Sequence, residues 1–197
     1  MDFVETLKKE GLFVFGKTDL MRLFGRSHTS VTFLLHRYSK RGVLIRLKNG
    51  LYALVGATIP EFYLANRLYE PSYVSLETAL SFHGIIPETV YAVTSITTLT
   101  PRERMVSGKR YLYHRIQPKA FTGYRPMEQG EFTCLIAEPE KALVDYYYFV
   151  ARGLRKPLDV DRLHLKNLDS HKLMEYASLF SHQKLDLLLK ELFSSKL

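Results

Sequence analysis

The dipeptide Asn49-Gly50 constrains the fold of this chain most, because it stands between two apolar-rich runs in RGVLIRLKNGLYAL, residues 41–54. Asn-Gly is a strong signal for a two-residue β-hairpin, since a type I′ turn needs positive φ at both central positions. Pairing the strands across this turn predicts that Arg46 and Lys48 share one face of the hairpin. The other face is predicted to hold apolar side chains, namely Val43, Ile45, Leu47, Tyr52 and Leu54.

Three short helices are predicted before the hairpin. Asp2 is placed to cap the first, over residues 3–10, and Thr18 to cap the second, which ends near Gly25. The third follows in SHTSVTFLLHRYSKRG, where apolar residues recur at i, i+3, i+4 and i+7. The short turn between the second and third helices is typical of a helix-turn-helix, and the hairpin behind it predicts a winged helix.

The positive charge of the chain is concentrated in the same region. The whole chain carries a net charge of +8, and residues 1–56 hold ten Lys/Arg against four Asp/Glu. Residues 57–197 hold eighteen against sixteen, so most of the excess lies in the first third. Such an excess indicates a polyanionic partner, with nucleic acid first and an anionic membrane surface second, while a solvated basic face is the plain alternative.

The third helix carries the residue types of a DNA-recognition helix on the face opposite its apolar stripe. The N-terminal residues of a recognition helix reach base edges in the major groove, and a cationic hairpin suits the phosphate backbone or the minor groove. We therefore predict base readout by side chains near the helix start and phosphate contacts by the cations of the hairpin and of the helix end. The predicted DNA-binding residues are Arg26, Ser27, His28, Thr29, Ser30, Thr32, Phe33, His36, Arg37, Lys40, Arg41, Arg46, Lys48 and Asn49.

A protein-interaction module is the main alternative, because winged helices also dock proteins without contacting DNA. Phe33 and His36 would then belong to a protein interface. Metal binding by His28 or His36 is not expected, since no Cys, Asp or Glu with ligand spacing accompanies them.

The remaining two thirds predict an α+β domain, residues 57–197, with a small antiparallel sheet and a helical C-terminus. Helices are expected after Pro60, after Ser75 and after Pro139, and the pattern from residue 157 onward is helical. The strand candidates are residues 91–98, 109–116, 121–125 and 131–137. The tyrosines at 146–148 cannot all face one way on a helix, so they are a candidate partner surface.

No catalytic constellation, cofactor motif or metal site is predicted. Asp159 and Asp161 form an acid pair, but their turn-like setting favours helix capping, and an enzyme acting on nucleic acid or nucleotides is kept only as a rival. The single Cys134 is expected in the core and fits a reduced, cytoplasmic setting. No apolar run approaches the ~18 residues of a membrane helix, so we expect no membrane span.

Three stretches together resemble the AbiEi-type antitoxins of abortive-infection systems. They are KRGVLIRLKNGLYAL at the end of the predicted winged helix, PSYVSLETALSFHGIIPE with the following YAVTSITT, and AEPEKALVDYYYF. The resemblance implies a cytoplasmic bacterial DNA-binding protein whose winged helix represses its own promoter at inverted repeats. It also implies a type IV toxin-antitoxin system, in which the larger C-terminal part counteracts a nucleotidyltransferase-like toxin.

Carried onto this chain, the resemblance places DNA binding on the helix Ser27–Lys40 and on the wing Arg46–Leu51. It places the antitoxin role within residues 60–197, without naming a residue for it. A stand-alone transcription factor without a toxin is the second alternative.

Overall fold

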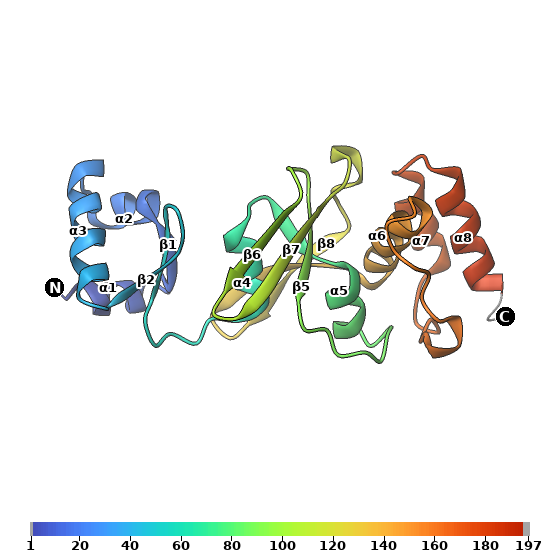
Figure 1. Ribbon diagram of the computed structural model, residues 1–197, viewed down its shortest axis with the longest axis horizontal. Coiled ribbons are helices and arrows are strands. Elements are labelled where there is room, and N and C mark those ends of the chain that lie inside the picture. Colours follow the sequence, from blue (N-terminus) through green and yellow to red (C-terminus); the bar gives the residue numbers. More distant parts are fainter. Residues whose placement is uncertain (1, 195–197) are drawn as a thin grey trace.

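The computed structural model describes residues 2–194 and shows an α+β protein with an elongated shape, the N-terminus at one end and the C-terminal helices at the other (Figure 1). The N-terminal elements are α1 (Phe3–Lys9), β1 (Val14–Gly16), α2 (Lys17–Phe24), α3 (His28–Lys40), β2 (Leu44–Lys48) and β3 (Leu51–Leu54). The elements that follow are α4 (Glu61–Leu68), β4 (Ser72–Val74), α5 (Leu76–Phe82), β5 (Val93–Thr97), β6 (Arg102–Val106), β7 (Lys109–Arg115), β8 (Tyr124–Gln129), β9 (Phe132–Ala137), α6 (Pro139–Ala151), α7 (Ser170–Ser178) and α8 (Gln183–Ser194).

The predicted cap of α1 at Asp2 is confirmed, and α3 is capped by Ser27, one of two candidates in the sequence beside Thr29. The Asp2 carboxylate accepts from the Val4 N–H at 3.4 Å, and the Ser27 hydroxyl accepts from the Ser30 N–H at 3.4 Å. The predicted cap of α2 at Thr18 is wrong, because the chain reaches helical geometry two residues earlier. There the N–H of Gly16, the residue that precedes α2, donates to the Asp19 carboxylate at 2.8 Å.

The hairpin β2–β3 forms across Asn49-Gly50 as predicted, but its faces differ from the prediction. β3 is the central strand of a three-stranded antiparallel sheet in the order β1-β3-β2, and β1 was not foreseen. A β-bulge between Arg46 and Lys48 shifts the register, so Arg46 lies opposite Tyr52. Ile45, expected to be buried, is 48% exposed.

Both faces of the central strand β3 are covered, which explains why an alternating pattern misassigned the faces of the hairpin. Phe15 and Leu54 pack with the three N-terminal helices, whereas Leu51 and Ala53 belong to the core of the second part of the chain. Between the two parts, the Arg67 guanidinium pairs with Asp19 at 3.1 Å. The sheet thus joins two hydrophobic clusters, and the domain boundary at residue 56 stays a prediction.

The second part is built on a six-stranded sheet in the order β6-β7-β5-β4-β9-β8. The predicted antiparallel sheet is wrong, because β4 pairs with β9 and β5 pairs with β7 in parallel. Parallel strands cannot be joined by a tight turn, and here β6 lies between β5 and β7 along the chain, while α5 and four strands lie between β4 and β9. β4 and β6 were also missed: the first has three residues, and the second lies within a stretch that reads as a charged connection.

Helix α6 lies at the centre of the second part and packs against α5, α7 and α8. Tyr146 and Tyr147 are buried, and the Tyr148 ring packs against Phe180 with ring centroids 4.3 Å apart and the planes tilted by 34°. The prediction of a partner surface at these tyrosines is therefore wrong, because α5, α7 and α8 pack around the helix that carries them. Every helix within residues 2–194 is too short or too polar to cross a bilayer.

Candidate nucleic-acid interface

Helix α3 lies at the outer end of the molecule (Figure 1). Val31, Leu34 and Leu35 are buried in the N-terminal cluster. At 100° per residue, Thr29 and Phe33 then project to the opposite side, and both are exposed. The Phe33 ring is 71% exposed, so this face of α3 presents one apolar ring to solvent among polar side chains.

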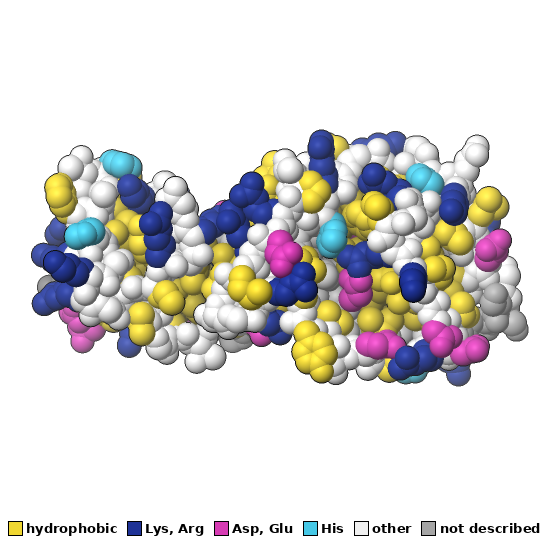
Figure 2. Space-filling view, in the orientation of Figure 1, with side chains coloured by type: hydrophobic (Ala, Val, Ile, Leu, Met, Phe, Trp, Pro, Cys, Tyr) yellow, Lys and Arg dark blue, Asp and Glu magenta, His cyan; other side chains and the backbone are white. Residues whose placement is uncertain are grey.

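The structure leaves nearly all of the predicted DNA-binding residues exposed. Lys48 is half-buried, and the other thirteen are exposed, namely Arg26, Ser27, His28, Thr29, Ser30, Thr32, Phe33, His36, Arg37, Lys40, Arg41, Arg46 and Asn49. Figure 2 shows Lys, Arg and His side chains gathered over the end of the molecule that α3 occupies.

The first turn of α3 combines short hydroxyl side chains with an uncompensated helix N-terminus, since it holds no acid. The hydroxyls of Ser27 and Ser30 lie 3.0 Å apart, and Thr32 donates to the His28 carbonyl at 2.8 Å. Lys17, which the sequence did not single out, places its ammonium 3.5 Å from the His28 ring. This arrangement suits an anion such as phosphate, because free N–H groups and the helix dipole both attract it.

The cations at the far end of α3 are held by an aromatic ring rather than by acids. The guanidinium carbons of Arg37 and Arg41 lie 5.2 Å and 5.9 Å from the centroid of the Tyr38 ring. Tyr38 itself stacks on Phe3, with 4.1 Å between the ring centroids. The salt bridges found among residues 2–194 include no cation of α3, so these charges remain available to a partner.

Arg46 lies at the tip of the hairpin and is ordered by the turn itself. Its guanidinium donates to the Asn49 side-chain carbonyl at 2.7 Å and to the Lys48 main-chain carbonyl at 3.4 Å. The side chain is exposed and has no acid partner among the described residues. The positive charge of Arg46 is therefore open to solvent or to a phosphate.

Lys48 departs from the predicted role of a phosphate contact. Its ammonium donates to the main-chain carbonyl of Leu68, at the end of α4, at 2.8 Å. Burial lowers the pKa of Lys48, with Glu70 opposing this shift and Arg104, Arg67 and Arg102 adding to it. Lys48 thus ties the hairpin to the second part of the chain.

Two arginines that the sequence did not single out extend the basic surface beyond the hairpin. Arg102 and Arg104 belong to β6 and lie close enough to Lys48 to influence its charge. Figure 2 shows Lys and Arg side chains along the notch between the N-terminal part and the rest of the molecule. The charge of the segment RERMV was visible in the sequence, but its place beside the hairpin depends on the sheet order.

The cysteine, the acid pair and a half-buried histidine make contacts that serve the fold. Cys134 is buried, which raises its thiol pKa to about 11, and the Asp159 carboxylate accepts from the Asp161 N–H at 3.2 Å. At the end of α5, His83 Nε2 lies 2.8 Å from the Ala137 carbonyl oxygen, and burial lowers the pKa of His83. Within residues 2–194, no group of His, Cys, Asp and Glu has the geometry of a metal site.

Comparison with known proteins finds no matching family model and no matching curated protein.

Proposed function

We propose that the N-terminal part is a winged-helix DNA-binding domain, with α3 as the recognition helix and β2–β3 as the wing. The observation that supports this most is the surface of α3, on which hydroxyl, imidazole and cationic side chains are exposed together without acid partners. A surface of this kind offers base-edge donors and phosphate contacts at the same time. The function needs no catalysis, cofactor or metal.

In this proposal the start of α3 enters the major groove. Thr29 and Thr32 lie one turn apart and face base edges, and the exposed Phe33 ring contacts a thymine methyl. Arg37 and Lys40 meet phosphates further along the groove. Arg46 meets the backbone, or the adjacent minor groove, from the hairpin.

We further propose that the chain is a cytoplasmic bacterial repressor of its own promoter, acting at inverted repeats, and the antitoxin of a nucleotidyltransferase-like toxin. This step rests on the resemblance to AbiEi-type antitoxins. Co-expression with a nucleotidyltransferase-like reading frame next to its gene tests it. Rescue of growth is expected, and unrelieved toxicity would contradict the antitoxin role.

A binding series on α3 tests the DNA interface. Duplex binding by the full chain is compared with Thr32→Ala and with the double variant Arg37→Ala/Lys40→Ala, using Lys184→Ala on α8 as the control. The double variant should weaken binding to every duplex. It should also lower the slope of log K against log salt by the amount expected for about two lost phosphate contacts. Thr32→Ala should relax sequence preference, and the control should bind as wild type. Equal binding by all four proteins would exclude α3 as the interface.

The protein-interaction alternative is favoured by one observation, the 71% exposure of Phe33. Phe33→Ala separates the two functions, because a ring that anchors a protein partner dominates its interface. Loss of a stoichiometric protein partner, with DNA binding unchanged, would favour that alternative over the winged helix on DNA.

A further inference from the structure

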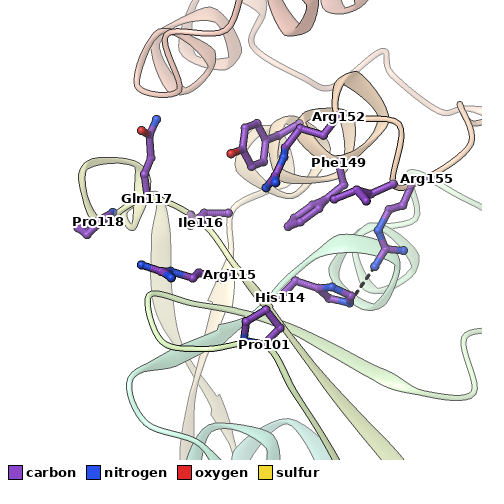
Figure 3. A pocket seen from close by; sticks show the side chains of 11 residues that line it. Pro101, His114, Arg115, Ile116, Gln117, Pro118, Phe149, Arg152 and Arg155 are labelled. Atoms are coloured by element: carbon purple, nitrogen blue, oxygen red, sulfur yellow. Dashed lines mark hydrogen bonds between the residues drawn. The ribbon is translucent and has the colours of Figure 1, made fainter.

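A second cationic site lies in the larger part of the molecule, away from α3. A cavity of about 900 Å³ opens between the C-terminal ends of β7 and α6, where no function has been placed so far. Its lining is drawn in Figure 3 and includes Arg115, Gln117, Phe149, Arg152 and Arg155. The volume is at the upper end of the roughly 300–1,000 Å³ that small-molecule sites occupy.

One of the three arginines of the cavity is committed to the protein. Arg155 pairs with Glu77 through one guanidinium nitrogen and contacts His114 Nε2 at 3.0 Å through another. Arginine only donates, so His114 Nε2 accepts, and the imidazole is neutral with its proton on Nδ1. Burial lowers the His114 pKa, which agrees with this assignment. Arg155 therefore orders one wall and is not the anion-binding group.

The other two arginines have free guanidinium groups. Arg115 and Arg152 are exposed, and neither forms a salt bridge within residues 2–194. The guanidinium carbon of Arg152 lies 5.5 Å from the Tyr148 ring centroid, so the side chain is supported from one side. Figure 3 shows Arg152 pointing from α6 toward the segment that carries Arg115 and Ile116. Two guanidinium groups at one cavity match the oxygens of a phosphate chain.

The rest of the lining is largely apolar and aromatic. Phe149 lies beside His114 with ring centroids 5.4 Å apart, and Ile116 closes the floor as a buried residue. Leu154 stands at the cavity with 61% of its surface exposed. The Gln117 amide donates to the Leu179 carbonyl at 2.8 Å, which fixes this edge against the C-terminal helices. Such walls bury a flat ring while the two arginines hold an anion.

We propose that this cavity binds a nucleoside phosphate, with Arg115 and Arg152 holding the phosphates and the base lying against the exposed Leu154 at the apolar side of the lining. The same chemistry is presented by a free nucleotide and by the 5′-phosphorylated end of RNA. The site is separate from α3 and does not depend on DNA binding there. A bound nucleotide would contact Arg115 at the end of β7 and Arg152 at the end of α6 at the same time. The larger part of the chain would then respond to a small molecule.

Isothermal titration of the full chain with ATP, GTP, CTP and UTP tests the site. At least one nucleotide should bind with 1:1 stoichiometry and a Kd below about 1 mM. Arg115→Ala and Arg152→Ala should each weaken binding about tenfold, and Arg152→Lys should weaken it too because the bidentate geometry is lost. Arg125→Ala, an exposed arginine of β8 outside the cavity, is the matched control. Both cavity arginines are exposed, so the variants should fold, as their melting curves will show.

Three further ligands identify what the cavity recognises. Adenosine and inorganic pyrophosphate should each bind at least about tenfold more weakly than the best nucleotide, because each has half of the contacts. A short RNA with a 5′-phosphate, compared with the same RNA without it, distinguishes an RNA end from a free nucleotide. No detectable nucleotide binding, binding unaffected by Arg115→Ala and Arg152→Ala, or pyrophosphate binding as tight as nucleotide would each overturn the proposal.

Discussion

Arg46 and Lys48 stand two residues apart on the same hairpin strand, yet their surroundings differ enough to predict opposite results on replacement. Arg46 is exposed at the tip, whereas the Lys48 ammonium donates to the Leu68 carbonyl at 2.8 Å. Sequence alone assigns both to phosphate. We therefore expect the phosphate contact from Arg46 alone, because the hydrogen bond of Lys48 fixes the hairpin to α4.

The magnitude for Arg46→Ala follows from counterion release. One lost phosphate contact lowers the slope of log K against log salt by about 0.9, which amounts to roughly a fivefold loss of affinity near 0.15 M salt. Lys48→Ala should leave the slope unchanged. It should instead lower the free energy of unfolding by about 1 kcal/mol, the usual loss for one partly exposed hydrogen bond.

Fluorescence anisotropy on a mixed-sequence duplex at several salt concentrations measures the slopes, and urea unfolding measures the stabilities. Equal slope losses for the two variants would mean that Lys48 leaves Leu68 and reaches the DNA. An unchanged slope for Arg46→Ala would remove the hairpin from the interface altogether.

Two further outcomes are expected in the larger part of the chain. Lys141→Ala should lower the free energy of unfolding by about 3–5 kcal/mol, because it leaves the fully buried Asp145 without its cation. Lys172→Ala breaks a partly exposed pair and should lower it by no more than about 1 kcal/mol. Similar losses for the two variants in urea unfolding would contradict the importance of the buried pair. Burial lowers the pKa of His83 and of His114 below 6.5, so the folded protein takes up these protons only at a lower pH than the unfolded chain. Stability should therefore fall as pH is lowered from about 6.5 through the folded pKa values, and the Gln variants at both positions should flatten the melting temperature against pH; a melting temperature that rises on acidification would refute the assignment.

The sequence predicts α3 well because a single amphipathic helix determines its own outer face. Once Val31, Leu34 and Leu35 are placed inward, the helical period alone directs Thr29 and Phe33 outward. The cap at Ser27 fixes the start of the helix in the same local way. These features need no knowledge of the rest of the fold.

The features that sequence reasoning missed depend on long-range pairing. The faces of the hairpin were misassigned because Leu51 and Ala53 pack into the second core, and a bulge after Arg46 shifts the register. Lys48 looks like any other wing cation until α4 is placed beside it. Arg115 and Arg152 line the same cavity but come from distant segments of the chain. No residue spacing in the sequence predicts that they lie at one cavity.

Binding of the purified protein to the DNA directly upstream of its own gene, measured against a scrambled duplex at several salt concentrations, tests the central claim most directly. The proposed repressor should prefer the native fragment by about a thousandfold or more and show a steep salt slope. Equal and weak binding to both duplexes would contradict specific recognition by α3 and would leave its exposed cations without a sequence-specific DNA partner at that site.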